Sequence, residues 1–272
     1  MTGAFYVGLM SGTSLDGVDA VLADFDAGRP RMIGVAHLPF DAALQRELLA
    51  LNSPGENEID RAALAGNALA RKYAAAVAEV LAGAKTPASR VRAIGCHGQT
   101  VRHQPERGYT TQIGNAALLA ELTGIRVVAD FRSRDVAAGG QGAPLVPAFH
   151  AAVFADGAED RVAINLGGIA NLSFLPGSGT VTGFDSGPGN CLLDLWASRH
   201  LGAPHDAGGN WAAAGQAIPA LLERMLQEPY FSAPPPKSTG RDLFNESWLR
   251  EKLRGDEDPQ AVQATLTISV KK

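Results

Sequence analysis

The sequence predicts an α/β protein built from two similar halves with a cleft between them. Each half opens with a strand, a glycine-containing turn, a second strand, another turn and a third strand, starting near residues 5 and 161. Helical spacing of apolar residues follows these strands in both halves. A repeated opening of this kind indicates an internal duplication. We therefore expect one domain at 1–160 and a second at 161–272.

Composition restricts the class of protein. The chain has 272 residues, of which 46% are hydrophobic and 19% charged, enough for one large or two modest cores. A net charge of −4 is unlike the basic surface of nucleic-acid-binding proteins. Cys96 and Cys191 fit no metal or disulfide spacing and are expected to be buried thiols in a reducing compartment. With no signal peptide and no membrane span evident, we expect a soluble cytoplasmic protein with no nucleic-acid or membrane partner.

The first half alternates strands with helices. The expected strands lie at 5–10, 18–25, 31–38, 91–96 and 125–129, and the expected helices at 41–51, 59–84 and 115–123. The long helix is alanine-rich, and Gly83 and Pro87 mark its end.

The second half repeats the opening strands and then becomes helical. Strands are expected at 162–166, 170–175 and 179–184, and helices at 191–201, 211–227 and 247–254. A further helical pattern starts at 258 and stops at 266.

The turn at 11–17 combines two glycines, three hydroxyl side chains and the carboxylate of Asp16. Backbone amides and hydroxyls in such a turn can form a concave anion site, and a carboxylate nearby can hold a hydrated Mg²⁺. The turn is not a Walker loop, because no lysine follows the second glycine and no helix begins there. An ordinary hairpin turn is the alternative.

Polar side chains follow two buried strands of the first half. His97, Gln99 and Thr100 come after the strand at 91–96 and suit a polyhydroxyl ligand, although a histidine there can also be purely structural. Asp130, Arg132 and Asp135 follow the strand at 125–129. These three residues could instead form a surface ion pair of little energetic value. The glycine-rich loop at 139–147 that comes next favours a functional interpretation.

In the second half, Asp185 is expected at the end of a strand and just before a helix N-terminus. Ligands of open α/β sheets bind at such places, where exposed amides favour anions. The alternative is that Asp185 caps the following helix. Asn165 and Asn171 flank the turn Gly167-Gly168 and extend polar groups toward the same ligand. The loop at 237–241 either contacts an anionic group or is simply solvated.

Taken together, these motifs resemble the anhydro-N-acetylmuramic acid kinases, a family of the actin, hexokinase and heat-shock-ATPase superfamily. The matching motifs are Gly8–Asp19, Gly95–Thr100, Val128–Arg132 with Asp135, Gly139–Pro147, Asn165–Gly168 with Asn171, and Gly183–Asn190. The resemblance covers residues 5–266. It implies two actin-like (ribonuclease H-like) domains, at 1–160 and 161–272.

The resemblance implies an ATP-dependent kinase of peptidoglycan recycling. Such a kinase opens 1,6-anhydro-N-acetylmuramic acid hydrolytically and phosphorylates O6, giving N-acetylmuramic acid 6-phosphate. Asp185 matches the family's general base. The residues matched to ATP binding are Gly12, Thr13, Ser14, Leu15, Asp16, Gly17, Val18, Asp19, Gly167 and Gly168. The candidates for the sugar side are His97, Gln99, Thr100, Asp130, Arg132 and Asp135. Mg²⁺ is implied, with Asp16 as a candidate behind its water ligands and no direct protein ligand assigned.

The second half is much shorter than the first and has no second glycine-rich loop for adenosine. We therefore expect the second domain to be incomplete and part of its core to be exposed. This leaves open an inactive, truncated remnant of the kinase, another sugar kinase with a free-hydroxyl substrate, or a polyphosphate phosphatase. The expected partner is the small-molecule sugar, and a homodimer is left open.

Overall fold

The computed structural model describes residues 5–26 and 29–270, which form a mixed α/β fold, as predicted. The chain divides into two compact units, Met1–Gly142 and Ala143–Lys272. The sequence analysis put the boundary after residue 160. The segment between these two positions contains helix α5 (Pro147–Phe154), which packs on strands of the second unit. The assignment of two actin-like domains stays a prediction.

The first unit is built on a five-stranded sheet. Its strands are β1 (Phe5–Met10), β2 (Gly17–Asp24), β3 (Arg31–Pro39), β4 (Val91–Cys96) and β7 (Val127–Ala129). They are ordered β3-β2-β1-β4-β7. The β1–β2 and β2–β3 pairs are antiparallel, whereas β4 runs parallel to both β1 and β7. All five strands were expected from the sequence.

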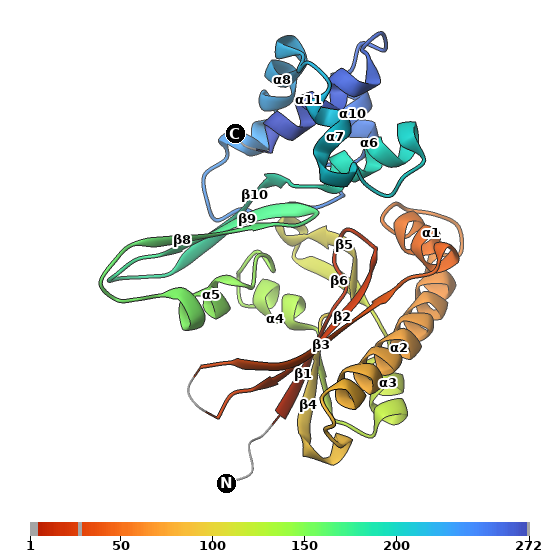
Figure 1. Ribbon diagram of the computed structural model, residues 1–272, viewed down its shortest axis with the longest axis vertical. Coiled ribbons are helices and arrows are strands. Elements are labelled where there is room, and N and C mark those ends of the chain that lie inside the picture. Colours follow the sequence, from red (N-terminus) through yellow and green to blue (C-terminus); the bar gives the residue numbers. More distant parts are fainter. Residues whose placement is uncertain (1–4, 27–28, 271–272) are drawn as a thin grey trace. The chain divides into compact units, whose positions relative to one another are not determined.

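Helices α1 (Ala42–Ala50), α2 (Glu58–Gly83) and α3 (Ala116–Thr123) complete the core of the first unit (Figure 1). Helix α2 packs on β2 and β3 and on α3. Its buried side chains recur at the spacing of one helical face. They include Leu69, Tyr73, Val77 and Val80. Val7 and Leu9 of β1 enter the same core because alternate residues of a strand point to one face of the sheet.

Three elements of the first unit lie where the sequence analysis expected none. Strands β5 (Gln99–Gln104) and β6 (Tyr109–Ile113) form an antiparallel hairpin, with the short helix η2 (Pro105–Arg107) at its turn. Helix α4 (Phe131–Ala137) follows β7. The two strands are short and mostly polar, and the buried positions of β5 include Gln99 and His103, so no apolar alternation marks them in the sequence. A further short helix, η1 (Ala88–Arg90), precedes β4.

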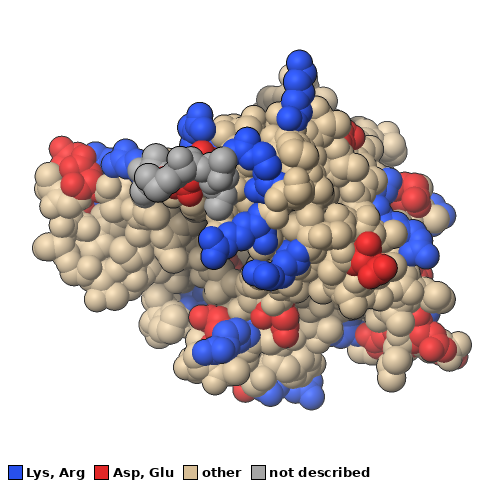
Figure 2. All heavy atoms as spheres, turned by 90° about the horizontal axis from the view of Figure 1, so that it is seen from below, with Lys and Arg blue, Asp and Glu red and all other residues tan. Residues whose placement is uncertain are grey.

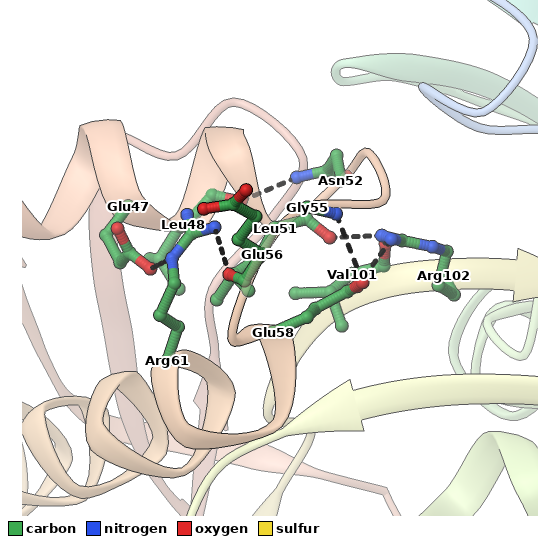
Figure 3. A network of polar contacts seen from close by, with 10 residues as sticks. All are labelled: Glu47, Leu48, Leu51, Asn52, Gly55, Glu56, Glu58, Arg61, Val101 and Arg102. Carbon is green, nitrogen blue, oxygen red and sulfur yellow. Dashed lines mark hydrogen bonds and ion pairs between the residues drawn. The ribbon is translucent and has the colours of Figure 1, made fainter.

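Arg102 ties the β5–β6 hairpin to the connection between α1 and α2 (Figure 3). Its guanidinium donates to the carbonyls of Leu51 and Val101 and pairs with Glu58. Nearby, Nε of Arg61 donates to Glu47 Oε1 at 2.7 Å. These contacts link segments that are up to 51 residues apart.

The second unit contains a three-stranded antiparallel sheet ordered β10-β9-β8. The strands are β8 (Arg161–Leu166), β9 (Ile169–Leu175) and β10 (Thr182–Pro188). Helix α5 packs on β9 and β8. Both units thus contain an antiparallel three-strand meander, which in the second unit follows α5.

Strand β8 carries an exposed row of apolar side chains. Val162 is 57% exposed, and Ile164 and Leu166 are each 64% exposed. Within the described residues, β8 pairs with β9 on one side only. The equivalent first strand of the other unit, β1, pairs on both sides.

The helices of the second unit surround a core of their own. They are α6 (Cys191–Leu201), α7 (Asn210–Ala213), α8 (Pro219–Leu226), α9 (Pro229–Ser232), α10 (Glu246–Lys252) and α11 (Pro259–Ser269), with η3 (Ala207–Gly209) before α7. Trp196, Phe244 and Trp248 are among the buried residues. Both cysteines are free and buried, and burial raises the pKa of each thiol to about 11.

Two helix predictions for this unit were wrong. A single helix at 211–227 is in fact two, α7 and α8, because Pro219 starts a new helix and cannot continue the old one. Helix α11 does not stop at residue 266 but continues to Ser269. The hydroxyls of Thr267 and Ser269 donate to the carbonyls of Gln263 and Leu266, so the polar residues stay within the helix.

In the described part of the chain, no helix is both long and apolar enough to cross a membrane. On the face shown in Figure 2, carboxylate groups lie among the Lys and Arg side chains, in keeping with a net charge of −4.

Candidate active site

Asp185 lies within strand β10, not at its end, because the strand continues through the glycine and proline to Pro188. A β-bulge between Asp185 and Gly187 locally alters the register with β9. The side chain is not a helix cap, since Asn190 occupies the cap position of α6. Asp185 is only 4% exposed, so the carboxyl group belongs to a protected site.

The loop before α10 holds Asp185 at three places. The amide of Asp185 donates to the carbonyl of Lys237 at 3.1 Å, and the hydroxyl of Tyr230 donates to the carbonyl of Asp185 at 2.7 Å. The amide of Thr239 donates to Oδ2 of the carboxylate at 3.1 Å. An amide bonded to a carboxylate oxygen favours the charged form of the acid.

Lys237 holds this loop in place. Its Nζ donates to the carbonyls of Tyr230 and Phe231 at 2.9 and 3.2 Å and lies 4.7 Å from the centre of the Tyr230 ring. Partial burial lowers its pKa. The loop at 237–241 is therefore anchored to the segment 230–231.

Asp185 is the buried end of a row of polar residues across the sheet. In the strand register Asp185 lies opposite Asn171, and Asn171 lies opposite Asn165. Directly opposite residues of antiparallel strands point to the same face. Asn165 is exposed, Asn171 is partly buried and Asp185 is buried.

The Gly167-Gly168 turn uses its carbonyls to hold the start of helix α6. The amide of Asn190 donates to Gly167 O, and the amides of Gly189 and Cys191 donate to Gly168 O, at 2.9–3.2 Å. The contact is close enough that a Cβ on Gly189 would lie 2.1 Å from the Gly167 oxygen. We expected exposed amides here, and instead these three amides have backbone partners.

The turn between β1 and β2 is ordered by short-range hydrogen bonds. Leu15 has a left-handed φ of 60°, and its amide donates to Gly12 O at 3.3 Å. Ser14 Oγ donates to Asp16 Oδ1 at 2.8 Å. Among the other predicted ATP-site residues, the side chains of Leu15 and Val18 lie in the core, whereas Asp19 is exposed and contacts His37. Only backbone atoms of Leu15 and Val18 could thus face a ligand.

Ser11 and Gln99 join this turn to the end of β4. Ser11 Oγ lies 2.7 Å from the Tyr73 hydroxyl and donates to Gly98 O at 3.2 Å. Gln99 Nε2 donates to Gly12 O at 3.2 Å. The structure thus brings the first predicted ATP motif and the His97 motif together. The sequence analysis missed Tyr73, because nothing in an alanine-rich helix distinguishes this tyrosine from an ordinary core residue.

His97 and Arg132 form the centre of the predicted sugar-side cluster. Arg132 Nε donates to His97 Nε2 at 2.8 Å, and His97 Nδ1 lies 2.6 Å from the carbonyl of Gly98. Burial, followed by the charge of Arg132, lowers the pKa of His97 to about 4. His97 is therefore a neutral imidazole near pH 7.

Arg132 and Asp135 meet at Gly142, the last residue of the first unit. Arg132 Nη1 donates to Gly142 O at 2.6 Å, and Gly142 N donates to Asp135 Oδ2 at 2.7 Å. A Cβ on Gly140 would lie 2.2 Å from Asp135 Oδ2, so the glycine is required for this close approach. The side chains of Arg132 and Asp135 both bind the backbone of the glycine-rich loop. They therefore do not form the simple Arg–Asp surface pair considered as the alternative.

Two predicted sugar-side residues lie apart from this cluster. Asp130 is exposed and has a left-handed φ of 62° at the start of α4. Thr100 accepts a hydrogen bond from Gln112 Nε2 at 3.2 Å within the β5–β6 hairpin. Nothing in the structure tests whether either residue binds a ligand.

Comparison with known proteins agrees with these motifs. The family model described as anhydro-N-acetylmuramic acid kinase matches residues 4–270. A protein of that name from Variovorax paradoxus is 59% identical over 278 residues, covering 98% of this chain and 74% of the relative. The relative from Nitrosospira multiformis is 57% identical over 268 residues, covering 98% of this chain and 73% of the relative.

Among solved structures, a chain of the PilM–PilN type IV pilus biogenesis complex is 14% identical, covers 99% of this chain and 98% of its own, and has a TM-score of 0.45. Similarity at that level is too low to support an argument. The sequence relatives and the family model are decisive. The chain belongs to the anhydro-N-acetylmuramic acid kinase family.

Proposed function

We propose that this chain uses ATP and water to open 1,6-anhydro-N-acetylmuramic acid and to place the γ-phosphoryl group on O6. Membership of the kinase family supports the reaction. The observation that carries the proposal in the structure is Asp185, a carboxyl group only 4% exposed and held by the amide of Thr239. We place the reaction in the cytoplasm, where ATP is available.

The proposed reaction balances as one hydrolysis and one phosphoryl transfer. The oxygen of water attacks C1 of the sugar, and the bond from C1 to O6 breaks. O6 takes its electron pair and attacks the γ-phosphorus, whose bond to the bridging oxygen of ADP breaks. Glycoside cleavage usually needs an acid to protonate the departing oxygen. Capture of O6 by phosphorus replaces that acid, so one carboxylate base is enough.

In this proposal Asp185 accepts the proton from water. A general base must be ionised to act, and the Thr239 amide donates a hydrogen bond to Oδ2 of this carboxyl group. The amide of Asp185 donates to the Lys237 carbonyl, and its carbonyl accepts from the Tyr230 hydroxyl. These two hydrogen bonds fix the backbone that carries the carboxylate. A fixed base loses little entropy when the reaction begins.

ATP phosphates are assigned to the turn Gly12–Asp19 and to Gly167-Gly168. Phosphoryl transfer requires mainly positioning and charge neutralisation. The described residues contain no group of three His, Cys, Asp or Glu side chains that could hold a metal. The Mg²⁺ of the proposal is assigned to phosphates and water, with exposed Asp16 behind the water ligands. When bound, Mg²⁺ would neutralise charge on the phosphates.

The sugar is assigned to His97, Gln99, Thr100, Asp130, Arg132 and Asp135. His97 holds Arg132 at Nε and Gly142 O holds it at Nη1, so the guanidinium offers N–H groups of defined direction. Such groups suit the hydroxyl, amide and carboxylate groups of N-acetylmuramic acid.

The test is to incubate the purified chain with MgATP and the anhydro sugar and to follow ADP and sugar 6-phosphate by mass spectrometry. Equal amounts of both products are expected from the wild-type chain, and none above background from Asp185→Asn. Reducing N-acetylmuramic acid in place of the anhydro sugar should give no product. Phosphorylation of the reducing sugar, phosphate release without sugar, or full activity of Asp185→Asn would each contradict the proposal.

A further inference from the structure

Two buried polar atoms close to Asp185 lack hydrogen-bond partners among the described residues. They are the Thr239 hydroxyl oxygen, Oγ1, and the Asn171 amide oxygen, Oδ1. Buried polar groups are nearly always hydrogen-bonded, because leaving one unpaired is costly. Two such atoms beside one buried carboxylate therefore need an explanation.

Both residues are tied to Asp185 by independent parts of the fold. The amide of Thr239 donates to Asp185 Oδ2 at 3.1 Å, which places its side chain next to the carboxylate. Asn171 lies directly opposite Asp185 on the neighbouring strand. Cβ atoms of residues paired in this way lie about 5 Å apart on one face of the sheet. The residues that carry a carboxylate, a hydroxyl and an amide oxygen are thus neighbours in the fold.

We propose that Thr239 and Asn171 hold the attacking water beside Asp185. This inference rests on the proposed function of Asp185 as the base. A water molecule has two protons and two lone pairs, and attack at C1 uses one lone pair. The Asp185 carboxylate accepts one proton and Asn171 Oδ1 binds the other. The Thr239 hydroxyl donates to the second lone pair, so all four directions of the water are used.

The surrounding contacts support this arrangement because they fix Thr239 relative to Asp185. Tyr230 donates to the Asp185 carbonyl at 2.7 Å, and the Lys237 carbonyl accepts from the Asp185 amide. Lys237 Nζ in turn binds the carbonyls of Tyr230 and Phe231. The loop from 230 to 239 is therefore attached to Asp185 at three positions, of which Thr239 is the last.

The arrangement selects water over other nucleophiles. Methanol has one hydroxyl proton, so it cannot bind both Asp185 and Asn171. Its methyl group would have to point at the unpaired Asn171 oxygen, which is unfavourable. We therefore expect the wild-type chain to discriminate against methanol and a variant without the Asn171 oxygen to accept it.

The test compares Thr239→Val, Thr239→Ser and Asn171→Leu. The matched control is Thr182→Val, at an exposed position of β10, the strand that carries Asp185. Valine keeps the shape and the backbone amide of threonine but lacks the hydroxyl. We expect kcat to fall about tenfold or more in Thr239→Val and in Asn171→Leu, because each variant loses one hydrogen bond to the attacking water. The KM for ATP should change less than about twofold. Thr239→Ser should stay near wild type.

The second readout is the ratio of methyl glycoside 6-phosphate to free sugar 6-phosphate, formed in dilute methanol and measured by mass spectrometry. This ratio does not depend on how much of the protein is folded. It should rise at least about threefold in Asn171→Leu and stay unchanged in the control, because only the variant removes the acceptor that favours water.

The outcomes separate this inference from the proposed function. If Asp185→Asn is inactive but Thr239→Val and Asn171→Leu match the control in kcat and product ratio, the inference is wrong and the base assignment stands. Equal losses in Thr239→Val and Thr239→Ser would also overturn it, because a structural role would explain both. No product from the wild-type chain, or an active Asp185→Asn, would overturn the proposed function and this inference with it.

Discussion

Arg132 donates a hydrogen bond from Nε to Nε2 of His97 at 2.8 Å, and this contact fixes the protonation state of the histidine. Because Nε2 accepts, the ring proton lies on Nδ1, which donates to Gly98 O. A protonated His97 would turn this acceptor into a donor facing a guanidinium. The pair is thus an acid-sensitive contact in the first unit.

Acid should destabilise the chain between pH 6.5 and 4. Burial and Arg132 lower the pKa of both His97 and His103 from 6.5 to about 4. The unfolded state then binds more protons in this window, so the stability that these histidines contribute is present above pH 6.5 and is lost as pH falls toward 4. Each contributes a slope of up to about 1.4 kcal/mol per pH unit.

Urea unfolding at several pH values would measure this slope. His97→Gln should reduce it, whereas substitution of the exposed His205 to Gln should not. An unchanged slope in His97→Gln would show that the histidine titrates normally in the folded chain.

Arg132→Lys is expected to impair use of the sugar. Lysine has a single ammonium group and cannot reach both His97 Nε2 and Gly142 O, as the planar guanidinium does. We expect kcat/KM for the sugar to fall about 10- to 100-fold, equal to about 1.4–3 kcal/mol, with KM for ATP nearly unchanged. Steady-state kinetics with each substrate varied would measure both. A larger change in KM for ATP than in KM for the sugar would contradict the assignment of Arg132 to the sugar site.

Tyr73→Phe is expected to loosen the turn assigned to ATP. The variant removes the hydroxyl that lies 2.7 Å from Ser11 Oγ, where Ser11 is 1% exposed. Loss of one buried hydrogen bond should cost about 1 kcal/mol of unfolding free energy. If the contact also positions Gly12, KM for ATP should rise several-fold. Tyr6→Phe, on the same strand that leads into the turn, is the control. A loss of stability without a change in KM would limit Tyr73 to a structural role.

The exposed row on β8 should promote self-association. Val162, Ile164 and Leu166 are 57–64% exposed on a strand that pairs with β9 alone in the described residues. Ile164→Thr combined with Val162→Thr keeps β-branched residues and removes apolar surface. We expect less aggregation by light scattering and a change of less than about 0.5 kcal/mol in stability, as for other exposed substitutions. A large loss of stability would mean that this face is buried in solution.

Local sequence patterns predicted most of the strands and several helices correctly. Apolar runs on either side of glycine-containing turns predicted β1 and β2, the repeat of that opening predicted β8, and glycine and proline marked where most elements end. The motifs also made Asp185 and the two glycine turns candidates for the site, and these assignments stay predictions. Local patterns failed where neighbouring residues do not decide the structure. The example is the β5–β6 hairpin, whose polar strands are held by Arg102 contacting Leu51. The break before Pro219, in contrast, was a local signal that the prediction overlooked.

The sequence by itself determined the α/β class, the three-strand meander of each unit and the residue types available for catalysis, because these depend on local periodicity and on motifs. Only the tertiary structure decided which of those residues meet. Ser11 contacts Tyr73 across 62 positions, and Asp185 contacts Thr239 across 54. Such contacts leave no local pattern, since they depend on how a helix packs on a sheet and how a loop folds back over a strand. Their partners become visible only when the chain is folded.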